Sequence, residues 1–396
     1  MISGAGPVGL VAALVLARAG VRVTVAEAAP ALSLDLRAST FHPPTLDMLA
    51  PLGLTDGLIP QGLIARYTQQ RDRQEGLIAE FDMELLRGDT DHPYRLQCEQ
   101  HKLVAMLERR VVEHPLARVL HGAELVGVTQ NDEQVQIEVR HPNGGSERFQ
   151  GKWLIGADGG RSLVRKSQDI GFEGFTWPER FLVITTTFDF ATLGYAYSSY
   201  TMDPIEWAAT FKVPGEDERG IWRCVFPTRP EESEQDLLDF ARAAQRLAAF
   251  APESVQGRIV HTNLYAVHQR VAQTYRKGRV LLAGDAAHVN NPLGGMGLNF
   301  GVHDAHNLAH RLGRVWRGEA GSDLLDQYDR QRRAVAERYL QAQTIANKQT
   351  LEETDETQRL ARQAAMRATA ADPQQAREYL RRTAMIEGLR AAAAID

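Results

Sequence analysis

The sequence predicts an α/β protein in which a parallel-sheet unit is interrupted by a mostly antiparallel β-sheet module and followed by a helical tail. Three observations lead to this fold class. A GxGxxG glycine motif lies near the start, between short apolar segments with strand and helix character. Residues 181–208 are rich in threonine and aromatic residues, which favour strands. Beyond residue 308, apolar residues recur at helical spacing.

Length and composition indicate a globular protein. The chain has 396 residues, enough for two interleaved subdomains, and 43% of them are hydrophobic. Its net charge of -5 is made of interspersed signs, which argues against nucleic-acid binding. With only Cys98 and Cys224, neither a disulfide framework nor a cysteine-rich metal site is expected. So few cysteines make a reducing, cytoplasmic compartment the expected one. The longest apolar run, residues 8–17, is too short to span a bilayer and lacks a signal-peptide cleavage pattern, so we expect no stable membrane insertion.

The N-terminal segment GAGPVGL predicts a dinucleotide-binding turn. Its glycines are Gly4, Gly6 and Gly9. Their spacing allows a tight turn, close approach of the backbone to a pyrophosphate, and packing of a helix on a strand. A helix over residues 8–19 and a strand over 21–26 follow, and Glu27 then stands where a carboxylate can bind a ribose. A purely structural turn is the alternative. Because only three residues precede Gly4, we expect the natural chain to begin earlier.

Two further polar segments are candidates for cofactor contacts. Arg37 precedes a helical segment at residues 45–54 and could reach a phosphate, or could equally be a solvated loop residue. A second strand–Asp–Gly turn contains Asp158 and Gly159, followed by two arginines. This turn suggests contact with phosphate or ribose groups. An N-capped helix is the commoner explanation of such a turn taken alone.

The β-rich module supplies candidate residues for a planar substrate. Residues 67–81 predict a hairpin, residues 100–112 an amphipathic helix, and residues 134–140 a strand with clean alternation. Within the aromatic block of residues 181–208 stand Tyr195, Tyr197, Tyr200 and Trp207. These side chains could line a pocket for a planar substrate, although most aromatic side chains of such a block belong to the core.

The segment from residue 279 to 308 predicts a ligand site. An apolar strand over residues 280–283 ends at Asp285, and a glycine-rich loop then precedes a helix. A carboxylate can accept hydrogen bonds from sugar hydroxyls, and a helix N-terminus stabilises negative charge. The segment can therefore hold an anionic or polar ligand.

The tail from residue 352 onward is rich in alanine, arginine, glutamine and glutamate. Charged helix faces are usually solvated, so we expect a solvated helical tail. Docking of the tail on a partner helix, or on a second copy of the chain, is the alternative.

Three motifs in this order resemble the FAD-dependent aromatic hydroxylases, the para-hydroxybenzoate hydroxylase-like flavoprotein monooxygenases. The motifs are GAGPVGL, GADGGRSLVRK and AGDAAHVNNPLGGMGLNFGVHDA, and LLDQYDRQRR is similar to the closing helix of the family. The resemblance implies a Rossmann-like FAD-binding domain of the glutathione-reductase type with an inserted substrate domain. It implies FAD-binding segments at 1–70, 96–175 and 273–320, substrate-domain segments at 71–95 and 176–272, and C-terminal helices at 321–396.

The resemblance also implies roles for individual residues. The three glycines of the first motif would hold the FAD pyrophosphate, and Glu27 the adenosine ribose. Other polar contacts to the cofactor would come from Arg37, Gln100, Asp158, Gly159 and Asp285. The loop and helix start beside the isoalloxazine ring would comprise Pro292, Gly295, Gly297, Leu298 and Asn299. There the helix N-terminus would stabilise the negative charge of reduced flavin.

The sequence departs from the family pattern at two points in this loop. Met296 stands where the family often has glutamine, and a thioether cannot replace the hydrogen bonds of an amide. The pair Gly294 and Gly295 suggests a roomier or more mobile loop. His288 lies nearby and could act as a base or tune the flavin, or could simply satisfy neighbouring polar groups. His288, Pro292 and Met296 are therefore the catalytic candidates.

The implied activity is hydroxylation of a phenol or hydroxylated N-heteroaromatic ring by O2, with NAD(P)H as reductant, through a flavin C4a-hydroperoxide. The alternatives are an FAD-dependent reductase of an unsaturated substrate and a flavin-binding protein that sequesters a ligand. The expected partners are a small aromatic substrate and O2. Nucleic acid and metal are not expected, and the chain is expected to be a monomer or a homodimer.

Overall fold

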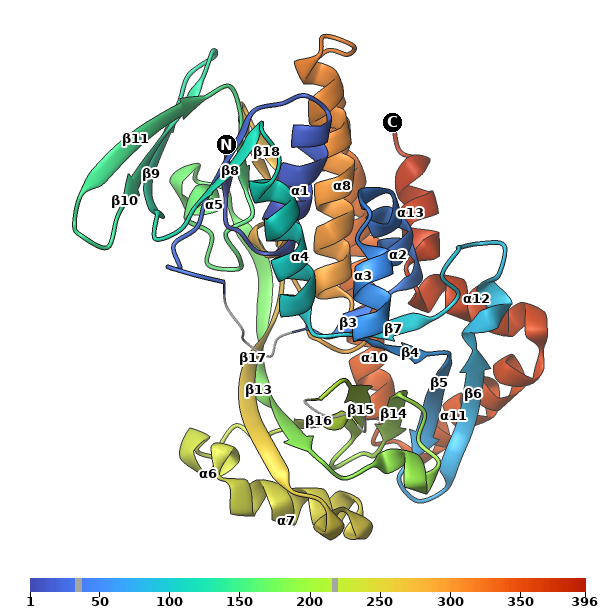
Figure 1. Cartoon of the computed structure of the whole chain (residues 1–396). Coiled ribbons are helices and arrows are strands. Elements are labelled where there is room, and N and C mark those ends of the chain that lie inside the picture. Colours follow the sequence, from blue (N-terminus) through green and yellow to red (C-terminus); the bar gives the residue numbers. More distant parts are fainter. Residues whose placement is uncertain (33–37, 216–219) are drawn as a thin grey trace.

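The computed structural model describes residues 1–32, 38–215 and 220–396, and a mostly parallel sheet organises its upper half in Figure 1. In sheet order its strands are β18 (Arg276–Lys277), β19 (Val280–Leu282), β12 (Leu154–Gly156), β1 (Ile2–Ser3), β2 (Val23–Ala26) and β8 (Ala117–Leu120). All neighbours run parallel except β18, which pairs antiparallel with β19 at one edge. Strands from distant parts of the chain therefore end side by side, and the predicted α/β class is confirmed.

Three helices pack with this sheet around one apolar core. They are α1 (Pro7–Arg18), α4 (Gln100–Val112) and α8 (Gly297–Trp316). Helix α1 contacts both of the others and buries almost every side chain, which explains why its sequence is apolar on all sides. The predicted helix over residues 100–112 is confirmed. The helix predicted over residues 8–19 is present as α1, which begins and ends one residue earlier than predicted.

A small antiparallel sheet lies at the edge of this half, beside the N-terminus in Figure 1. Its strands are β9 (Glu124–Gln130), β10 (Val135–Arg140) and β11 (Ser146–Gly151). The alternation that predicted β10 has a physical cause. Val135, Ile137 and Val139 are buried in the main core, while the residues between them are half-buried or exposed.

The lower half contains an eight-stranded sheet that is antiparallel except where β14 meets β5. In sheet order the strands are β20 (His288–Val289), β17 (Ile259–Ala272), β13 (Phe172–Thr186), β16 (Ile221–Pro227), β15 (Ala208–Val213), β14 (Ser198–Met202), β5 (Tyr67–Asp72) and β6 (Gly76–Asp82). The predicted hairpin over residues 67–81 is confirmed as β5 and β6. β13 and β17 are long, pair along most of their length, and connect the two halves.

The two faces of this sheet have different coverings. Trp222, Cys224 and Phe226 point to one face, where α6 (Glu234–Leu238) and α7 (Phe240–Phe250) complete an apolar core. The alternate positions, including Val225, point to the other face with Tyr200 and Leu293. This second face is directed toward the parallel-sheet half, so a site between the halves is lined by it.

A third sheet connects the halves. It contains β3 (Thr40–Phe41), β7 (Arg95–Gln97) and β4 (Leu63–Ala65), in that order. Short helices flank it: α2 (Pro43–Leu49), a 3-10 turn at Ala50–Leu52, and α3 (Thr55–Leu58). The helix predicted over residues 45–54 is thus broken, because Pro51 interrupts α-helical hydrogen bonding.

The C-terminal helices pack on the rest of the chain. They are α9 (Leu324–Val335), a π-helical segment at Ala336–Gln341, α10 (Ala342–Leu351), α11 (Glu356–Ala371), α12 (Pro373–Thr383) and α13 (Ile386–Ala393). Leu380 and Ile386 are buried in a core with Phe81 of the β5–β6 hairpin. The expectation of a solvated tail is wrong, because the apolar positions between its charges find a surface within the same chain.

A single carboxylate fixes this tail. The side chain of Asp89 is 2% exposed and pairs with Arg377, Arg381 and Arg390 at 2.8, 3.0 and 2.6 Å. Burial alone would raise the pKa of Asp89, but the hydrogen bonds from these arginines hold it at about 2. Helices α12 and α13 are thereby attached to the loop that follows β6.

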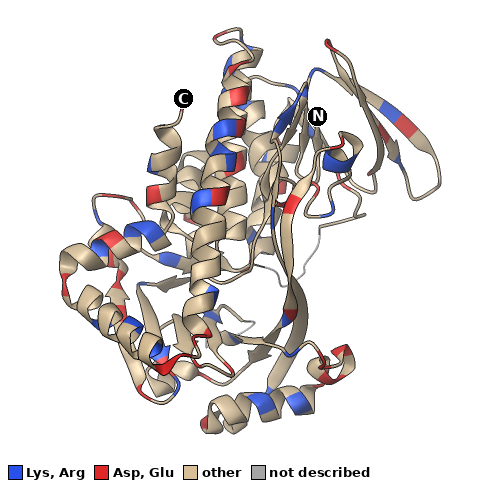
Figure 2. Cartoon of the chain, turned by 180° about the vertical axis from the view of Figure 1, so that it is seen from behind, with Lys and Arg blue, Asp and Glu red and all other residues tan. Residues whose placement is uncertain are grey.

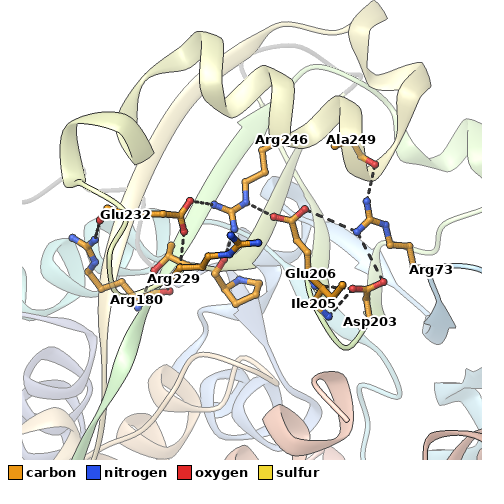
Figure 3. A network of polar contacts seen from close by, with 11 residues as sticks. Arg73, Arg180, Asp203, Ile205, Glu206, Arg229, Glu232, Arg246 and Ala249 are labelled. Atoms are coloured by element: carbon orange, nitrogen blue, oxygen red, sulfur yellow. Dashed lines mark hydrogen bonds and ion pairs between the residues drawn. The ribbon is translucent and has the colours of Figure 1, made fainter. Parts of the chain in front are cut away.

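At the far end of the eight-stranded sheet, charged residues form an outer network around α7 (Figure 3). Arg246 donates to Glu206 at 2.6 Å, to Glu232 at 3.2 Å and to the Pro227 carbonyl at 2.6 Å. A hollow of about 190 Å³, lined in part by Arg73 and Arg246, opens beside it. This hollow lies on the outer rim, remote from the glycine motifs, and each acid around it faces an arginine.

Positive and negative side chains are interspersed over the face shown in Figure 2. Among the described residues, none of the helices is both long enough and apolar enough to cross a membrane.

Candidate functional site

The four polar motifs of the sequence meet at one edge of the parallel sheet. Ser3 is in register with Ala26 on one side and Gly156 on the other, and Gly156 is in register with Leu282. The residues that follow these strands therefore gather at the carboxyl edge of the sheet. They are Gly4, Glu27, Asp158 and Asp285. In open α/β sheets this edge is where ligands bind.

The first glycine turn is shaped by close backbone contacts. Gly4 has a φ of +99°, and a Cβ there would lie 2.4 Å from the Ala157 carbonyl oxygen. A Cβ on Gly9 would lie 2.0 Å from the Gly4 carbonyl oxygen, so the helix can approach the strand only with glycine. Gly6 differs, because a Cβ there would meet nothing within 4 Å. It opens onto free space at the start of α1, where no side chain caps the helix.

Glu27 joins this turn to the end of β2. Its Oε2 accepts a hydrogen bond from the Ala5 N–H at 2.7 Å, and its Oε1 accepts one from the Ala29 N–H at 2.9 Å. Each carboxylate oxygen has a second acceptor position. The geometry fits a carboxylate that both shapes the glycine turn and receives a ribose hydroxyl.

Asp158 serves mainly its own turn. Its carboxylate accepts from the Ser162 hydroxyl at 2.6 Å and from the Val164 N–H at 3.1 Å, and Ser162 caps α5 (Leu163–Ser167). The N-capped helix, which was the alternative explanation, is therefore present. Gly159, with a φ of +78°, leaves open space beside it. Arg165 donates to the Ala286 carbonyl at 2.9 Å, which ties this turn to the one that contains Asp285.

Asp285 is exposed at the carboxyl end of β19 and lies close to the first glycine motif. A Cβ on the neighbouring Gly284 would lie 2.8 Å from a methyl group of Val8, and one on Gly301 of α8 would lie 2.6 Å from that methyl group. The start of α1, the Asp285 turn and α8 therefore share one corner of the molecule.

The 289–297 loop is tightly held, contrary to the expectation of a roomy or mobile loop. Gly295 has a φ of +65°, and a Cβ there would lie 3.0 Å from Cβ of Thr40. Asn299 donates to the carbonyls of Thr40 and Gly295 at 2.8 and 2.7 Å. Its side-chain oxygen accepts from the His42 N–H at 2.9 Å. The glycines are needed because neighbouring segments press against the loop on both sides.

The first turn of α8 follows this loop without a side-chain cap. Gly297 and Leu298 are half-buried at its start, so their N–H groups stay available to a ligand. Pro292 is exposed at the opposite end of the loop. The available N–H groups, the open space at Gly6 and the carboxylates at the strand ends fit a large, polar, anionic cofactor.

Met296 does not face this space. It is 2% exposed and packs in an apolar cluster with Phe300, Leu340 and Met385. A methionine fits there because the C-terminal helices cover the position with apolar side chains. Its assignment as a catalytic candidate is not supported by this placement.

His288 is also directed into the protein. Its ring is 1% exposed, and Nε2 lies 2.7 Å from Oδ2 of Asp304. The other oxygen of Asp304 pairs with Arg332 at 2.6 Å, and Oδ2 also accepts from the Gly284 N–H. This placement favours a supporting role beneath the loop over that of a base on a substrate.

A row of buried polar side chains, with Arg95 and Gln97 on β7 and Glu99 just after it (the β7 row), was not singled out from the sequence. Arg95, Gln97 and Glu99 alternate with the core residues Leu96 and Cys98, so all three share one face. Alternation of this kind is normally read as a solvated face, yet the three are only 4, 0 and 6% exposed. Among the described residues, no partner is found for Nε of Arg95 or for Nε2 of Gln97. Buried donors of this kind are available to an ordered water, an ion or a ligand.

The row faces the second face of the eight-stranded sheet. Nη1 of Arg95 donates to the hydroxyls of Ser198 and Tyr200 at 3.1 and 3.4 Å. Arg223 is 6% exposed on β16. Burial lowers its pKa, while the nearby Glu99 and Tyr265 raise it. Charged groups of the β7 row and hydroxyl groups of β14 therefore meet between the three-stranded and the eight-stranded sheet.

His42 adds an acceptor at the same place. Its pKa is well below the usual value because of burial and the nearby Arg95, despite the opposing hydrogen bond to the Gly294 carbonyl. The neutral ring must carry its proton on Nε2, because that nitrogen faces this carbonyl at 2.8 Å. Nδ1 is then a buried acceptor, and the described residues provide no partner for it.

The predicted aromatic residues divide between the two faces. Tyr200 is the one that reaches the β7 row. Trp207 is 1% exposed and packs edge-on against Phe181. Tyr195 and Tyr197 pack toward the α7 side of the sheet, so the structure does not place them at this site.

Two predicted cofactor residues remain. Gln100 is half-buried at the first position of α4, next to the β7 row. Arg37 lies outside the described residues.

This fold and site define a flavin-binding protein, and comparisons with known proteins identify the family. A family model described as an FAD binding domain matches residues 1–343. Para-nitrophenol 4-monooxygenase of Pseudomonas sp. (strain WBC-3) is 35% identical over 381 residues, which cover 96% of this chain and 94% of that one. 6-hydroxy-3-succinoylpyridine 3-monooxygenase HspB of Pseudomonas putida (strain DSM 28022 / S16) is 34% identical over 337 residues, 84% of each chain.

The crystal structure of p-nitrophenol 4-monooxygenase PnpA from Pseudomonas putida DLL-E4 is similar throughout. It superposes with a TM-score of 0.91 at 34% identity, covering 98% of this chain and 97% of that one. The chain belongs to the family of FAD-dependent aromatic hydroxylases. It is an FAD-dependent aromatic monooxygenase, and NAD(P)H is the usual reductant of this family.

Proposed function

We propose that the chain hydroxylates a small phenol or hydroxylated N-heteroaromatic ring that binds between the β7 row and the 289–297 loop. The observation that carries this proposal is the set of buried polar groups on β7, of which Arg95 and Gln97 have donors without partners among the described residues. Two relatives act, by name, on a nitrophenol and on a hydroxypyridine. Rings of this kind have both a flat apolar face and a polar edge.

The charges of the site favour an ionised ring. Arg95 is 4% exposed, and its guanidinium donates to two hydroxyls, those of Ser198 and Tyr200, while the carboxylate of Glu99 pairs with Lys102 at 2.8 Å. A phenolate, or a ring with another anionic substituent, would supply a counter-charge for Arg95. Arg95 and Tyr200 would orient such a substrate. An ionised hydroxyl also donates electrons to the ring, which favours transfer of an electrophilic oxygen to it.

The cofactor would lie along the carboxyl edge of the parallel sheet. Gly4, Gly6 and Gly9 would accommodate its pyrophosphate, and Glu27 its adenosine ribose. Asp158 and Gly159, Asp285, Gln100 and Arg37 would contribute further contacts. Gly295, Gly297, Leu298 and Asn299 would form the wall beside the flavin ring, with Pro292 at the mouth. When bound, FAD accepts hydride from NAD(P)H and, once reduced, activates O2 for transfer to the ring.

The chain's own task is binding, orientation and exclusion of water. Burial of the β7 row strengthens every polar contact to the substrate and excludes solvent from the reacting atoms. The N–H groups at the start of α8 would stabilise negative charge on the reduced ring. His288 and Met296 would support this wall from behind.

The division into segments remains a proposal. FAD-binding segments at 1–70, 96–175 and 273–320 and substrate-domain segments at 71–95 and 176–272 would precede C-terminal helices at 321–396. Strand β5 crosses the first of these boundaries. We also propose a cytoplasmic enzyme that acts as a monomer or a homodimer.

The test is oxygen incorporation from ¹⁸O2. Purified protein with FAD and NADH or NADPH is supplied with 4-nitrophenol, 3-(3-hydroxyphenyl)propionate or a 2-hydroxypyridine, and products are analysed by mass spectrometry. We expect at least one substrate to gain one labelled oxygen per NAD(P)H oxidised. Oxidation of NAD(P)H that yields only hydrogen peroxide with all of them would overturn the proposal. So would reduction of the substrate without oxygen, or binding without turnover.

A further inference from the structure

Helix α10 contacts the 289–297 loop along one face. Gln341, at the end of the preceding π-helical segment, donates to the Val289 carbonyl at 2.9 Å. The carbonyl of Thr344 accepts from the Asn291 side chain at 2.9 Å, and Nδ2 of Asn347 donates to the Leu293 carbonyl at 3.2 Å. The three helix positions are spaced by three residues, so they face the loop together. Gln341 is the last residue of the π-helical segment, and such segments are frequent at functional sites.

Strand β17 completes this contact. Oε1 of Gln269 accepts from the Asn291 N–H at 2.6 Å, while its amide nitrogen contacts Gln341 and Thr344 at 2.5 and 3.3 Å. Gln269, Asn291 and Thr344 are at most 2% exposed. The network consists of amides and a hydroxyl, so it holds the loop equally at any pH at which the protein is folded.

Asn347 donates to the carbonyl of the peptide between Leu293 and Gly294. In a planar trans peptide the carbonyl and the N–H point in opposite directions. Because the Leu293 carbonyl points to Asn347, the Gly294 N–H points away from α10. The described residues supply no acceptor for this N–H. A Cβ on Gly294 would lie 3.0 Å from Nδ2 of Asn347, so this glycine permits the close approach.

The next peptide is held from the other side of the loop. The carbonyl of Gly294 accepts from His42 at 2.8 Å, and the Gly295 N–H donates to the Pro292 carbonyl at 3.0 Å. Of the groups in this turn, the Gly294 N–H is the donor that is left for a ligand. It lies in the same loop that leads into the uncapped first turn of α8.

We propose that Asn347 is a positioning residue for the reacting end of the cofactor. By holding the Leu293 carbonyl against α10, it directs the Gly294 N–H toward the flavin ring, where that N–H stabilises the negative charge of the reduced form. This inference rests on the proposed placement of the flavin beside Pro292 to Asn299. Donors that are fixed before the charge develops require no reorganisation when it does. The effect therefore falls on the reduced flavin more than on the oxidised one.

The test is the midpoint potential of bound FAD, measured by equilibration with a reference dye. Asn347→Leu keeps the volume of the side chain and removes its donor. We expect the preference for reduced over oxidised FAD to fall about tenfold, which lowers the two-electron potential by about 30 mV. Gln349→Leu is the matched control, because Gln349 is an exposed amide on the same helix. Its potential should equal that of the parent.

A variant at the start of α8 tests the placement of the flavin separately from the role of Asn347. Gly297→Ala adds a methyl group at the start of α8, where it would meet only Oδ1 of Asn290 at 3.4 Å. A shifted flavin spectrum in Gly297→Ala with an unchanged potential in Asn347→Leu would overturn the role of Asn347 alone. Unchanged flavin properties in both variants would overturn the placement as well. If Asn347→Leu does not retain FAD, Asn347→Ala is measured, and an unchanged potential there would equally refute the role.

Discussion

Two arginine–carboxylate networks of similar chemistry lie in different surroundings, one in the interior of the molecule and one on its outer rim. Beneath the 289–297 loop, Asp304 pairs with Arg332 at 2.6 Å, and their side chains are 0 and 1% exposed. In the outer network of Figure 3, Arg246 pairs with Glu206 at the same distance, but these side chains are 16 and 19% exposed. The bond lengths are equal, so the difference between the networks is their access to water.

Access to water decides what each network does. In the buried network, the attraction between the charges is strong, and removing one partner leaves the other charged without solvent. In the outer network, water can replace any missing partner, and salt screens the attraction. The buried network can therefore fix the Gly284 turn and the 289–297 loop in one arrangement, whereas the outer network only holds α7 near the sheet.

The largest effect is expected when the buried network loses its charge. Asp304→Asn leaves Arg332 buried without a counter-charge, and it weakens the contacts to His288 and Gly284. We expect a loss of about 3–5 kcal/mol in the free energy of unfolding. Urea titration followed by tryptophan fluorescence measures this loss. FAD should also dissociate more readily, because the loop beside it is less well fixed.

The control for this experiment is Asp326→Asn. Asp326 pairs with Arg276 at 2.9 Å, but its side chain is 55% exposed. Its loss should change the free energy of unfolding by less than about 1 kcal/mol. Equal effects of the two substitutions would refute the distinction drawn from burial.

Asp89 provides a case between these extremes. Its carboxylate is buried, while its arginine partners are 25–53% exposed. Because its pKa is about 2 in the folded chain, below the usual 3.8, its contribution is present above about pH 4 and is lost as the pH falls toward 2. We expect about 2 kcal/mol of docking free energy for α12 and α13 to disappear over this range.

Hydrogen exchange of the backbone amides of α12 and α13 measures this docking. Protection in these helices should fall between pH 4 and pH 2.5 before it falls in α1, after correction for the intrinsic pH dependence of exchange. In Asp89→Asn the two helices should already be less protected at pH 7. Protection that is as strong in Asp89→Asn as in the parent would show that the apolar contacts of Leu380 and Ile386 suffice.

Those elements that depend on local patterns were predictable from the sequence. The glycine motifs, the helix over residues 100–112 and the strand at residues 135–140 follow from spacing and periodicity, which are properties of short segments. The fold class followed from their order. Site residues were less predictable, because His288 and Met296 were assigned by their position in a motif. Which way each side chain faces depends on Asp304 and on the C-terminal helices, which are distant in the sequence.

The burial of the β7 row could not be predicted from the sequence either. Its alternation was present in the sequence as Arg95, Leu96, Gln97, Cys98 and Glu99. A strand with one polar face is normally solvated on that face, and only the position of the eight-stranded sheet reveals that this one is buried. The orientation of the Gly294 peptide by Asn347 could not be predicted either, because the two residues lie 53 positions apart and meet through the packing of α10.

The smallest effect is expected in the outer network. Arg246→Met keeps an unbranched side chain and removes the charge that lies 5.9 Å from the Phe226 ring, leaving Glu206 and Glu232 to be solvated. We expect a loss of less than about 1 kcal/mol in the free energy of unfolding, and a smaller one in 1 M salt, where screening acts within about 3 Å. A double-mutant cycle with Glu206→Gln isolates the pair. A coupling above about 2 kcal/mol that persists in salt would mean that this network behaves as a buried one, and partial exposure would then be a poor guide to the strength of either network.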